Sequence, residues 1–440
     1  MNRSIHTMTR VLVLLVLLVC VTFAGGYQLN EHGARAVGMG GAFVATASDP
    51  SAVFYNPAGL AFQSGINVMG GGTLIIPSTQ FTPAPGTILY TETKTLSNVF
   101  FPPNLYGTYA LDNKWVAGIG VYSPYGLGTE WPTDWQGGSL AVNSQVTTFY
   151  VTPTISYKVM DNLSLGLGAS FVYGKVSMSH RVTAFSALTA VGGGFYAPTV
   201  STTPGTVNLD GTATGFGFDV GVMYKPITIL SVGVSFRSET KLNFSGTATF
   251  SGMQASAPYF PGGDGKASLP MPMNLWGGIA FTGIDRLTIE GDLQYIDWTV
   301  YKDLSITLPA GPPINLVVAG PTFMPGYVMQ ASTTYPKNWD KGYIFRLGGE
   351  YTLNDQLALR LGGIYDYTPQ PNSKIEPMLP DANRLDLTAG AGMKLNEHVS
   401  VDVAYMIVLF SNRSTSTAPL AGGTYESIAN LFAVDISYKF

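Results

Sequence analysis

The chain ends in the stretch Leu431-Phe-Ala-Val-Asp-Ile-Ser-Tyr-Lys-Phe440, in which apolar and mostly polar residues alternate. A β-strand projects successive side chains to opposite faces, so one face of this stretch is wholly apolar and the other is mostly polar. The closing strand of a transmembrane β-barrel has this pattern, with its apolar face towards lipid and its other face towards the lumen. A half-buried strand of a soluble sheet has it too, so the rest of the chain must decide.

The composition favours the barrel. Only 11% of the 440 residues are charged, which is well below the roughly one quarter typical of soluble domains. Glycine (52 residues) and tyrosine (24 residues) are abundant. The apolar residues are dispersed along the chain, as they are when lipid-facing and lumen-facing positions alternate. The formal net charge of −4 argues against nucleic acid as a partner.

Residues 1–24 have the pattern of a signal peptide. Arg3 and Arg10 precede an almost purely apolar core, and Ala24 offers a cleavage position. The only cysteine, Cys20, would be removed with this peptide, which excludes disulfides and thiol chemistry from the mature chain. No later stretch is long and apolar enough for a transmembrane helix, and a closed barrel is the other structure that spans a bilayer with its backbone hydrogen bonds satisfied.

The spacing of turns predicts fourteen antiparallel strands. Short polar turns such as Asp112-Asn113 alternate with longer segments such as 183–205 and 308–341. Transmembrane barrels alternate in this way, with short turns on the periplasmic side and long loops outside. The predicted strands span residues 66–82, 98–111, 115–123, 143–159, 163–182, 206–224, 228–250, 265–282, 286–307, 342–352, 356–368, 383–394, 398–411 and 425–440.

The charges within these strands lie on one face. In the strand 356–368, Leu357, Leu359 and Leu361 share a face and Arg360 lies on the other. A charged Arg or Lys on the lipid side near the bilayer midplane would cost about 2–4 kcal/mol. We therefore expect the charged face to line the lumen.

Residues 25–65 do not follow the barrel pattern, because glycine and proline divide them into short, mostly apolar turns. A segment of about forty residues cannot hold a core of its own, so it must pack against something, and a barrel of this size has room inside. The expected fold is all-β: a 14-stranded antiparallel transmembrane β-barrel (66–440) with an N-terminal hatch, or plug (25–65), inside the lumen.

Several motifs then resemble those of one family. They are Gly26-Tyr-Gln-Leu-Asn-Glu31, Arg35-Ala36 and Asn56-Pro57-Ala58 in the hatch, and Ser123-Pro-Tyr-Gly-Leu127, Phe236-Arg-Ser-Glu-Thr-Lys241, Asn274-Leu-Trp276 and Asp297-Trp298 in the barrel. With these residues the chain resembles the FadL-type outer-membrane transporters of long-chain fatty acids and other hydrophobic compounds. The likeness covers nearly all of the mature chain.

The resemblance implies passive uptake across the outer membrane of a Gram-negative bacterium. Cargo would bind in an apolar groove among the external loops, enter a pocket above the hatch, and leave sideways where the third strand kinks inward. The implied partners are hydrophobic small molecules, outer-membrane lipid and the barrel-assembly machinery, which would read the C-terminal strand. The resemblance also implies a monomer, and no cofactor motif is visible.

Two groups of residues are expected along this route. The hatch group comprises Gln28, Asn30, Arg35, Asn56, Pro57 and Ala58. Gln28 and Asn30 would place polar groups in the pocket or cap the hatch backbone, and Asn56-Pro57-Ala58 would lie near the gap or form a plain turn. The kink group comprises Ser123, Pro124, Tyr125 and Gly126. Proline lacks an N–H for the ladder and glycine tolerates unusual dihedrals, although the same residues would also suit the start of an external loop.

Two further groups concern the cargo. The external groove would be formed by Phe185, Leu188, Phe195, Tyr196, Met253, Tyr259 and Phe260, unless these side chains pack against one another. The possible carboxylate contacts are His180, Arg181 and Lys302. The match to the family's basic positions is imperfect here, which leaves uncharged cargo such as hydrocarbons open, with these residues as lumen or rim charges.

Each alternative function predicts a structural feature that a hydrophobic-compound transporter would lack. A general diffusion porin for polar solutes would have an open lumen, and an outer-membrane lipid-modifying enzyme would bring a serine and a histidine together. The mature chain has His32, His180 and His398, and none has metal-ligand spacing. We predict that the protein is not an enzyme, while a structural barrel or phage receptor remains a further alternative.

Overall fold

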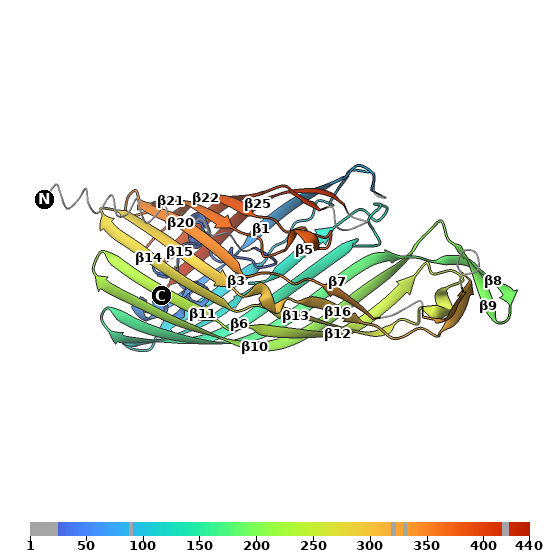
Figure 1. Cartoon of the computed structure of the whole chain (residues 1–440). Coiled ribbons are helices and arrows are strands. Elements are labelled where there is room, and N and C mark those ends of the chain that lie inside the picture. The colour runs from blue at the N-terminus through green and yellow to red at the C-terminus, as the bar shows by residue number, and fades with distance from the viewer. Residues whose placement is uncertain (1–24, 88–90, 318–322, 329–331, 416–421) are drawn as a thin grey trace.

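The computed structural model describes residues 25–87, 91–317, 323–328, 332–415 and 422–440 (Figure 1). The predicted signal peptide, residues 1–24, lies outside the described residues. Within the described ranges, fourteen antiparallel strands form a closed barrel, as the alternation of short and long connections predicts. In chain order they are β1 (Ile66–Pro83), β3 (Pro103–Ala110), β4 (Trp115–Tyr122) with β5 (Gly126–Glu130), β6 (Asn143–Met160), β7 (Leu163–Val182), β10 (Gly205–Ile227), β11 (Leu230–Arg237) with β12 (Thr240–Ser251), β13 (Gly263–Met271) with β14 (Asn274–Ile284), β15 (Leu287–Ile296) with β16 (Asp303–Thr307), β20 (Gly342–Thr352), β21 (Leu357–Asp366), β22 (Arg384–Lys394), β23 (Val399–Phe410) and β25 (Gly423–Lys439).

The C-terminal strand closes the barrel. β25 pairs with β1 from Asn67↔Lys439 to Pro83↔Gly423, and with β23 on its other side. Closure of this kind leaves no exposed sheet edge, so every strand finds hydrogen-bond partners within the wall. The backbone N–H of Phe440 donates to Ile66 O, which places the C-terminus at the end of the barrel that carries the short turns.

Three predicted strands are interrupted. Where the sequence pattern predicts continuous strands over 228–250, 265–282 and 286–307, the structure has the pairs β11–β12, β13–β14 and β15–β16. Pro272 lies between β13 and β14 and has no N–H to donate to the ladder. Between β15 and β16 the short helix η3 (Trp298–Val300) turns inward, and the Trp298 side chain is wholly buried.

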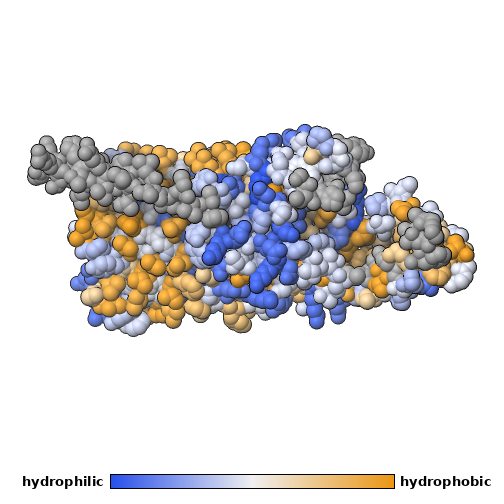
Figure 2. Space-filling view, viewed as in Figure 1, coloured by the Kyte–Doolittle hydropathy of each residue, from blue (hydrophilic) through white to orange (hydrophobic). Residues whose placement is uncertain are grey.

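The outer face carries an apolar band near the end with the short turns (Figure 2). Phe216, Leu347 and Leu361 are 76%, 63% and 70% exposed, whereas Arg346 and Arg360 on the inner face are buried. Such exposure of apolar residues would be unfavourable in water but suits lipid, and it confirms the predicted direction of the charged face. Among the described residues, no helix is both long enough and apolar enough to cross a membrane.

Strands β7 and β10 extend past most of the barrel wall on the side opposite the short turns (Figure 1). A small separate sheet lies beyond them, in the order β18-β17-β9-β8. The remaining elements are short: β2 (Thr93–Lys94), β8 (Phe185–Gly192), β9 (Phe195–Val200), β17 (Ile314–Val317), β18 (Phe323–Tyr327), β19 (Thr333–Pro336), β24 (Arg413–Thr415), η2 (Ala257–Tyr259) and η4 (Asn372–Lys374).

The N-terminal segment, residues 25–65, crosses the lumen. Its helix α2 (Ala34–Gly38) contacts β21, β22, β23 and β25, and η1 (Pro57–Phe62) contacts β4, β6, β7 and β10. Between them lies α3 (Ala52–Tyr55), whose four residues are all buried. Glycines on the inner wall permit the close approach, because a Cβ added to any of them would lie closer than 3.0 Å to this segment. They are Gly166, Gly221, Gly233, Gly348, Gly362 and Gly390.

Candidate functional site

The third barrel strand is broken where β4 gives way to β5. Its pairing with β3 stops at Leu105↔Val121, and β5 resumes pairing with β6 at Gly126↔Thr147. Between these points the chain turns into the lumen and pairs with the N-terminal segment instead. Leu29 N donates to Pro124 O (2.9 Å), and Gly126 N donates to the carbonyl of Tyr27 (2.9 Å). The wall between β3 and the third strand is therefore interrupted at this height.

A cavity of about 320 Å³, here called the gap cavity, lies at this break. Its inner part is lined by lumen residues such as Glu31 and Leu431, and its outer part by Phe101 and Thr147, which face away from the lumen. Phe101 is 53% exposed on the outer surface, whereas Leu431 is 3% exposed. The gap cavity thus extends from the lumen to the lipid-facing side of the wall.

A second, smaller cavity of about 50 Å³, here called the inner cavity, adjoins it in the lumen. Aromatic rings form much of its lining: the Tyr27 ring lies 6.0 Å from Trp339, and Tyr301 lies 5.1 Å from Trp339. The one cation in the lining, Lys337, is 2% exposed and its Nζ is bonded to the Glu376 carboxylate. The inner cavity is therefore apolar, and its one ion pair is internally neutralised.

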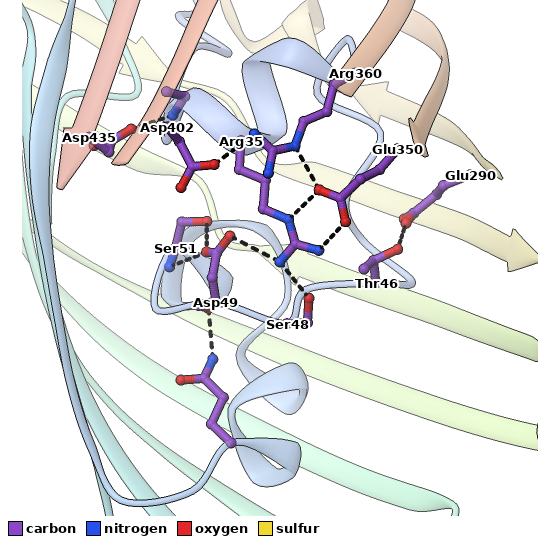
Figure 3. A network of polar contacts seen from close by, with 12 residues as sticks. Arg35, Thr46, Ser48, Asp49, Ser51, Glu290, Glu350, Arg360, Asp402 and Asp435 are labelled. Carbon is purple, nitrogen blue, oxygen red and sulfur yellow. Dashed lines mark hydrogen bonds and ion pairs between the residues drawn. The ribbon is translucent and has the colours of Figure 1, made fainter. Parts of the chain in front are cut away.

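A network of ion pairs holds the N-terminal segment to the wall (Figure 3). The Arg35 guanidinium donates to both carboxylate oxygens of Glu350 at 2.8 and 2.7 Å. Glu350 also accepts from Arg360 (2.6 Å), which in turn donates to Asp402 (2.6 Å). Bidentate charge-assisted pairs of this type fix orientation as well as distance.

Carboxylates of the barrel wall, and Asp381 in the loop between β21 and β22, also accept hydrogen bonds from the backbone of the N-terminal segment. Asp292 accepts from Phe43 N (2.9 Å) and Val44 N (3.1 Å). Asp381 accepts from Gly26 N at 2.8 Å, and Asp435 accepts from Ala34 N. Within the described residues, the N-terminal segment forms no strand of the barrel wall, so these buried backbone N–H groups need other acceptors. The carboxylates supply them.

Most of the predicted hatch and kink residues occupy two places. Arg35 instead belongs to the ion-pair network described above, and Asn30 Oδ1 accepts from Gln28 Nε2 (2.9 Å). Gln28, Ser123, Tyr125 and Gly126 line the gap cavity. Asn56, Pro57 and Ala58 instead begin η1 against β6, β7 and β10, where Asn56 Oδ1 accepts from Ala58 N (3.1 Å). The side-chain amide of Asn56 also donates to Val222 O (3.1 Å), so this triplet joins the segment to the wall.

The seven residues predicted to form one external groove lie in the separate sheet and in the segment 251–264. These two parts touch, because Ala255 N donates to Phe185 O (2.9 Å), and Phe260 packs against the ring of Phe250, 5.2 Å away. Phe185 begins β8, so it belongs with Leu188, Phe195 and Tyr196 to the separate sheet of β8, β9, β17 and β18, and Tyr259 lies in η2. None of the seven lines the gap cavity or the inner cavity.

The predicted carboxylate contacts lie away from both cavities as well. Arg181, next to His180 on β7, bonds to the loop 131–142: its backbone N–H donates to Gly138 O (2.7 Å) and its guanidinium to Trp135 O. Lys302 is exposed. The charged residues that do line the cavities are Glu31, Arg384, Lys337 and Glu376. Sequence reasoning missed this role for them, because a single charge in a barrel strand or loop resembles any other lumen charge.

His32 in the N-terminal segment is buried against aromatic rings. Its ring lies 4.1 Å from that of Phe54 and 5.7 Å from that of Tyr122. Burial, and to a lesser extent the nearby Arg237 guanidinium, lower the pKa of His32 from 6.5 to about 3. The packed state therefore holds a neutral imidazole, and its stability is full above pH 6.5 and declines as the pH falls towards 3.

This shift predicts a pH dependence for the packing of the N-terminal segment. Below pH 6.5, amide hydrogen-exchange protection of residues 34–62, corrected for intrinsic rates, is expected to fall by roughly tenfold per pH unit. His32→Phe keeps a ring against Phe54 but cannot be protonated, so it should remove that part of the pH dependence. An unchanged pH profile in His32→Phe would contradict the assignment.

Comparisons with known proteins agree with this architecture. The Escherichia coli K12 long-chain fatty acid transport protein is 23% identical over 469 residues, covering 100% of both chains. A Pseudomonas aeruginosa FadL homologue of known structure superposes with a TM-score of 0.80 at 20% identity, covering 94% of this chain and 100% of the other. The Pseudomonas putida toluene transporter TodX superposes with a TM-score of 0.72 at 18% identity, covering 95% and 100%.

The family model described as "Outer membrane protein transport protein (OMPP1/FadL/TodX)" matches residues 15–440. The match includes the strand break, the N-terminal segment and the closing strand, so it covers every part of the site described above. The chain therefore belongs to the OMPP1/FadL/TodX family of outer membrane transport proteins.

Proposed function

We propose that this protein mediates passive uptake of hydrophobic molecules and releases them sideways through the gap cavity into the outer membrane. The observation that carries the proposal is a single cavity that reaches from the lumen to the lipid-facing surface at the broken third strand. In this proposal the N-terminal segment acts as the hatch. It supports the inward turn of the third strand and directs cargo towards the wall.

Cargo would reach the gap cavity from the external side. The relatives named as a fatty acid transporter and a toluene transporter support hydrophobic cargo as the class. Apolar side chains of the external loops, such as Phe185, Met253 and Phe260, are proposed as first contacts, and the aromatic inner cavity as the next. The strand β25, with Phe440 at its end, is the segment we propose for recognition by the barrel-assembly machinery.

The environment below the N-terminal segment supports a lateral route. A cavity of about 500 Å³ at the short-turn end is lined by charged residues that include Arg35, Asp49, Glu350 and Asp402. A hydrophobic molecule that enters this region would desolvate those charged groups, whereas the bilayer offers it an apolar solvent. Exit through the wall therefore costs less than passage through this charged region.

Two alternatives receive less support. A general porin for polar solutes would need an open lumen, and here the N-terminal segment crosses it. For a lipid-modifying enzyme, the described histidine contacts do not favour a serine–histidine pair: His32 packs against Phe54, and His398 Nδ1 lies 2.7 Å from Lys439 O. We therefore keep transport as the proposal.

Closing the outer mouth of the gap cavity should stop uptake. Thr147 lines this mouth from β6 and is exposed on the outer face, so in Thr147→Trp the indole would occupy the exit. We expect most of the uptake of labelled toluene and oleate to be lost in a transporter-deficient strain that expresses this variant. Thr214→Trp is the matched control, because Thr214 on β10 also faces outward but lines none of the cavities described here. Wild-type uptake by Thr147→Trp would refute the lateral route.

A further inference from the structure

If the gap cavity is the exit for cargo, the charges of its lining residues influence which molecules can pass through it. Its charged lining residues are Glu31 and Arg384. Arg384 is already engaged, because its guanidinium donates to Asp366 at 2.6 Å. An adjoining cavity of about 130 Å³ shares Arg384 and adds the carboxylates of Glu130 and Asp381. Acidic groups therefore outnumber the basic ones that a carboxylate would meet on this route.

Burying a carboxylate in such a place would be unfavourable. A buried anion requires a positive or hydrogen-bonding partner, and like charges nearby raise the cost further. The basic residues considered as possible carboxylate contacts, namely His180, Arg181 and Lys302, do not line the gap cavity. Lys337 in the inner cavity is paired with Glu376, so it presents no free charge either.

Two residues that line the same cavity each carry a buried neutral polar atom without a partner. Within the part of the chain that the structure describes, Gln28 Oε1 and Ser123 Oγ are buried and accept or donate no hydrogen bond. Both residues line the gap cavity, and they are 4% and 2% exposed. Leaving a buried polar atom unpaired costs about 1–3 kcal/mol, so a ligand group that pairs with it gains affinity.

A hydroxyl group matches both atoms. It can donate to an amide oxygen such as Gln28 Oε1 and can accept from a hydroxyl such as that of Ser123, whereas a pure hydrocarbon can do neither. The remaining lining, which includes Ile75, Phe100 and Phe149, offers apolar surface for a tail. At about 320 Å³ the cavity is within the range of small-molecule sites.

We propose that the gap cavity selects neutral amphiphiles that carry a hydroxyl group, such as long-chain alcohols, over carboxylates with the same tail. Gln28 and Ser123 recognise the hydroxyl group, and Glu31 with its acidic neighbours disfavours the carboxylate. This inference rests on the proposed transport function and names the cargo class of the same site.

Uptake of three probes with equal tails tests the inference. Labelled 1-dodecanol, dodecanoate and dodecane are supplied at pH 7.5 to a transporter-deficient strain that expresses the full chain, and the rate in cells without it is subtracted. Dodecanol is expected to enter fastest. Gln28→Met and Ser123→Ala are each expected to slow dodecanol by about threefold to tenfold, the effect of one lost hydrogen bond, and to leave dodecane unchanged. Glu31→Gln is expected to raise the rate of dodecanoate.

A control variant tests whether the loss of any buried hydroxyl slows the uptake of dodecanol. Tyr106→Phe removes another buried hydroxyl without a partner in the described residues, and Tyr106 lines neither the gap cavity nor the inner cavity, so this variant should leave the dodecanol rate unchanged. Ser123→Ala is a minimal change, and folding of each variant is checked by heat-modifiable gel migration. Equal rates for dodecanol and dodecanoate, or a dodecanol rate that neither substitution alters, would overturn the inference while the transport function stands. Uptake of none of the three probes would instead contradict the proposed transport function.

Discussion

Gly362→Val is expected to displace the N-terminal segment and open the lumen to polar solutes. Gly362 lies on the inner face of β21, where a built Cβ would lie 2.3 Å from Gly40 N and 2.4 Å from the carbonyl carbon of Met39. Because these are backbone atoms, no side chain can move aside to relieve the clash. Overpacking typically costs about 1–3 kcal/mol, which would raise the displaced population by about 5- to 150-fold.

The measurement is passage of a polar solute. Single-channel conductance of the reconstituted protein, and influx of a hydrophilic antibiotic into cells, should both increase. The barrel itself should persist, because valine suits a strand and the ladder of β21 is unchanged. Gly277→Val on β14 is the control, since its Cβ would have no atom within 4 Å. Unchanged conductance in a folded Gly362→Val protein would show that the segment does not close the lumen.

Arg237→Met is expected to cause the second large effect, a loss of stability where the N-terminal segment meets β11. The Arg237 guanidinium donates to Asp219 at 2.6 Å and to the carbonyl of Phe54 in α3 at 3.0 Å. It also lies over the Phe54 ring, 4.6 Å from its centroid. Asp219 and Arg237 are both 2% exposed. Removing one partner of a buried ion pair typically costs about 3–5 kcal/mol, because the other charge stays buried without compensation.

Unfolding temperature in detergent, read from the heat-modifiable gel band, measures this effect. Arg237→Met should lower it strongly, and the double variant Arg237→Met/Asp219→Asn should recover part of the loss because no unpaired charge remains. Arg286→Met is the comparison at an exposed pair, since Arg286 lies 3.9 Å from Asp285 at the surface, and it should change little. No recovery in the double variant would mean that packing, rather than charge, dominates at Arg237.

Much of the barrel follows from local patterns. The closing strand shows why: in Phe432, Val434 and Ile436 the alternation is continuous, and these side chains are 48%, 44% and 57% exposed on the outer face. Short turns such as Asp112-Asn113 mark where strands reverse. Both signals depend on a few neighbouring residues, so a sequence displays them directly.

The interruptions of the wall are harder to predict. Ser123-Pro-Tyr-Gly126 marks the kink by its proline and glycine, but the partners that replace the lost ladder bonds come from Tyr27 and Leu29, nearly a hundred residues earlier. The inward turn at Trp298 likewise depends on the rings it meets, such as Tyr27 at 4.5 Å. Contacts so distant in sequence leave no local periodicity.

Among the residues of the candidate site, some are indicated by the sequence and others are identified only by the structure. For Gln28 the sequence leaves two roles open, a polar group in the pocket or a cap of the hatch backbone, and the structure places it in the lining of the gap cavity. The loops that carry Lys337 and Glu376 fold inward and make an ion pair beside the inner cavity, which no spacing in the sequence indicates. Arg181 has a suitable charge for a carboxylate, yet its guanidinium bonds to Trp135 O in a neighbouring loop.

The sequence by itself therefore determined an all-β barrel of fourteen strands, its closing strand and its lumen-facing charges, because side-chain alternation and turn chemistry are local properties. The kink was expected from the family resemblance, because the same residues would also suit the start of an external loop. Only the tertiary structure decided which residues line the gap cavity and which charges are already paired there. Those features depend on where the N-terminal segment crosses the lumen, and its position is set by wall glycines such as Gly362 and wall carboxylates such as Asp292. A carboxylate or a glycine acquires such a role only when distant strands bring it within contact of the same backbone.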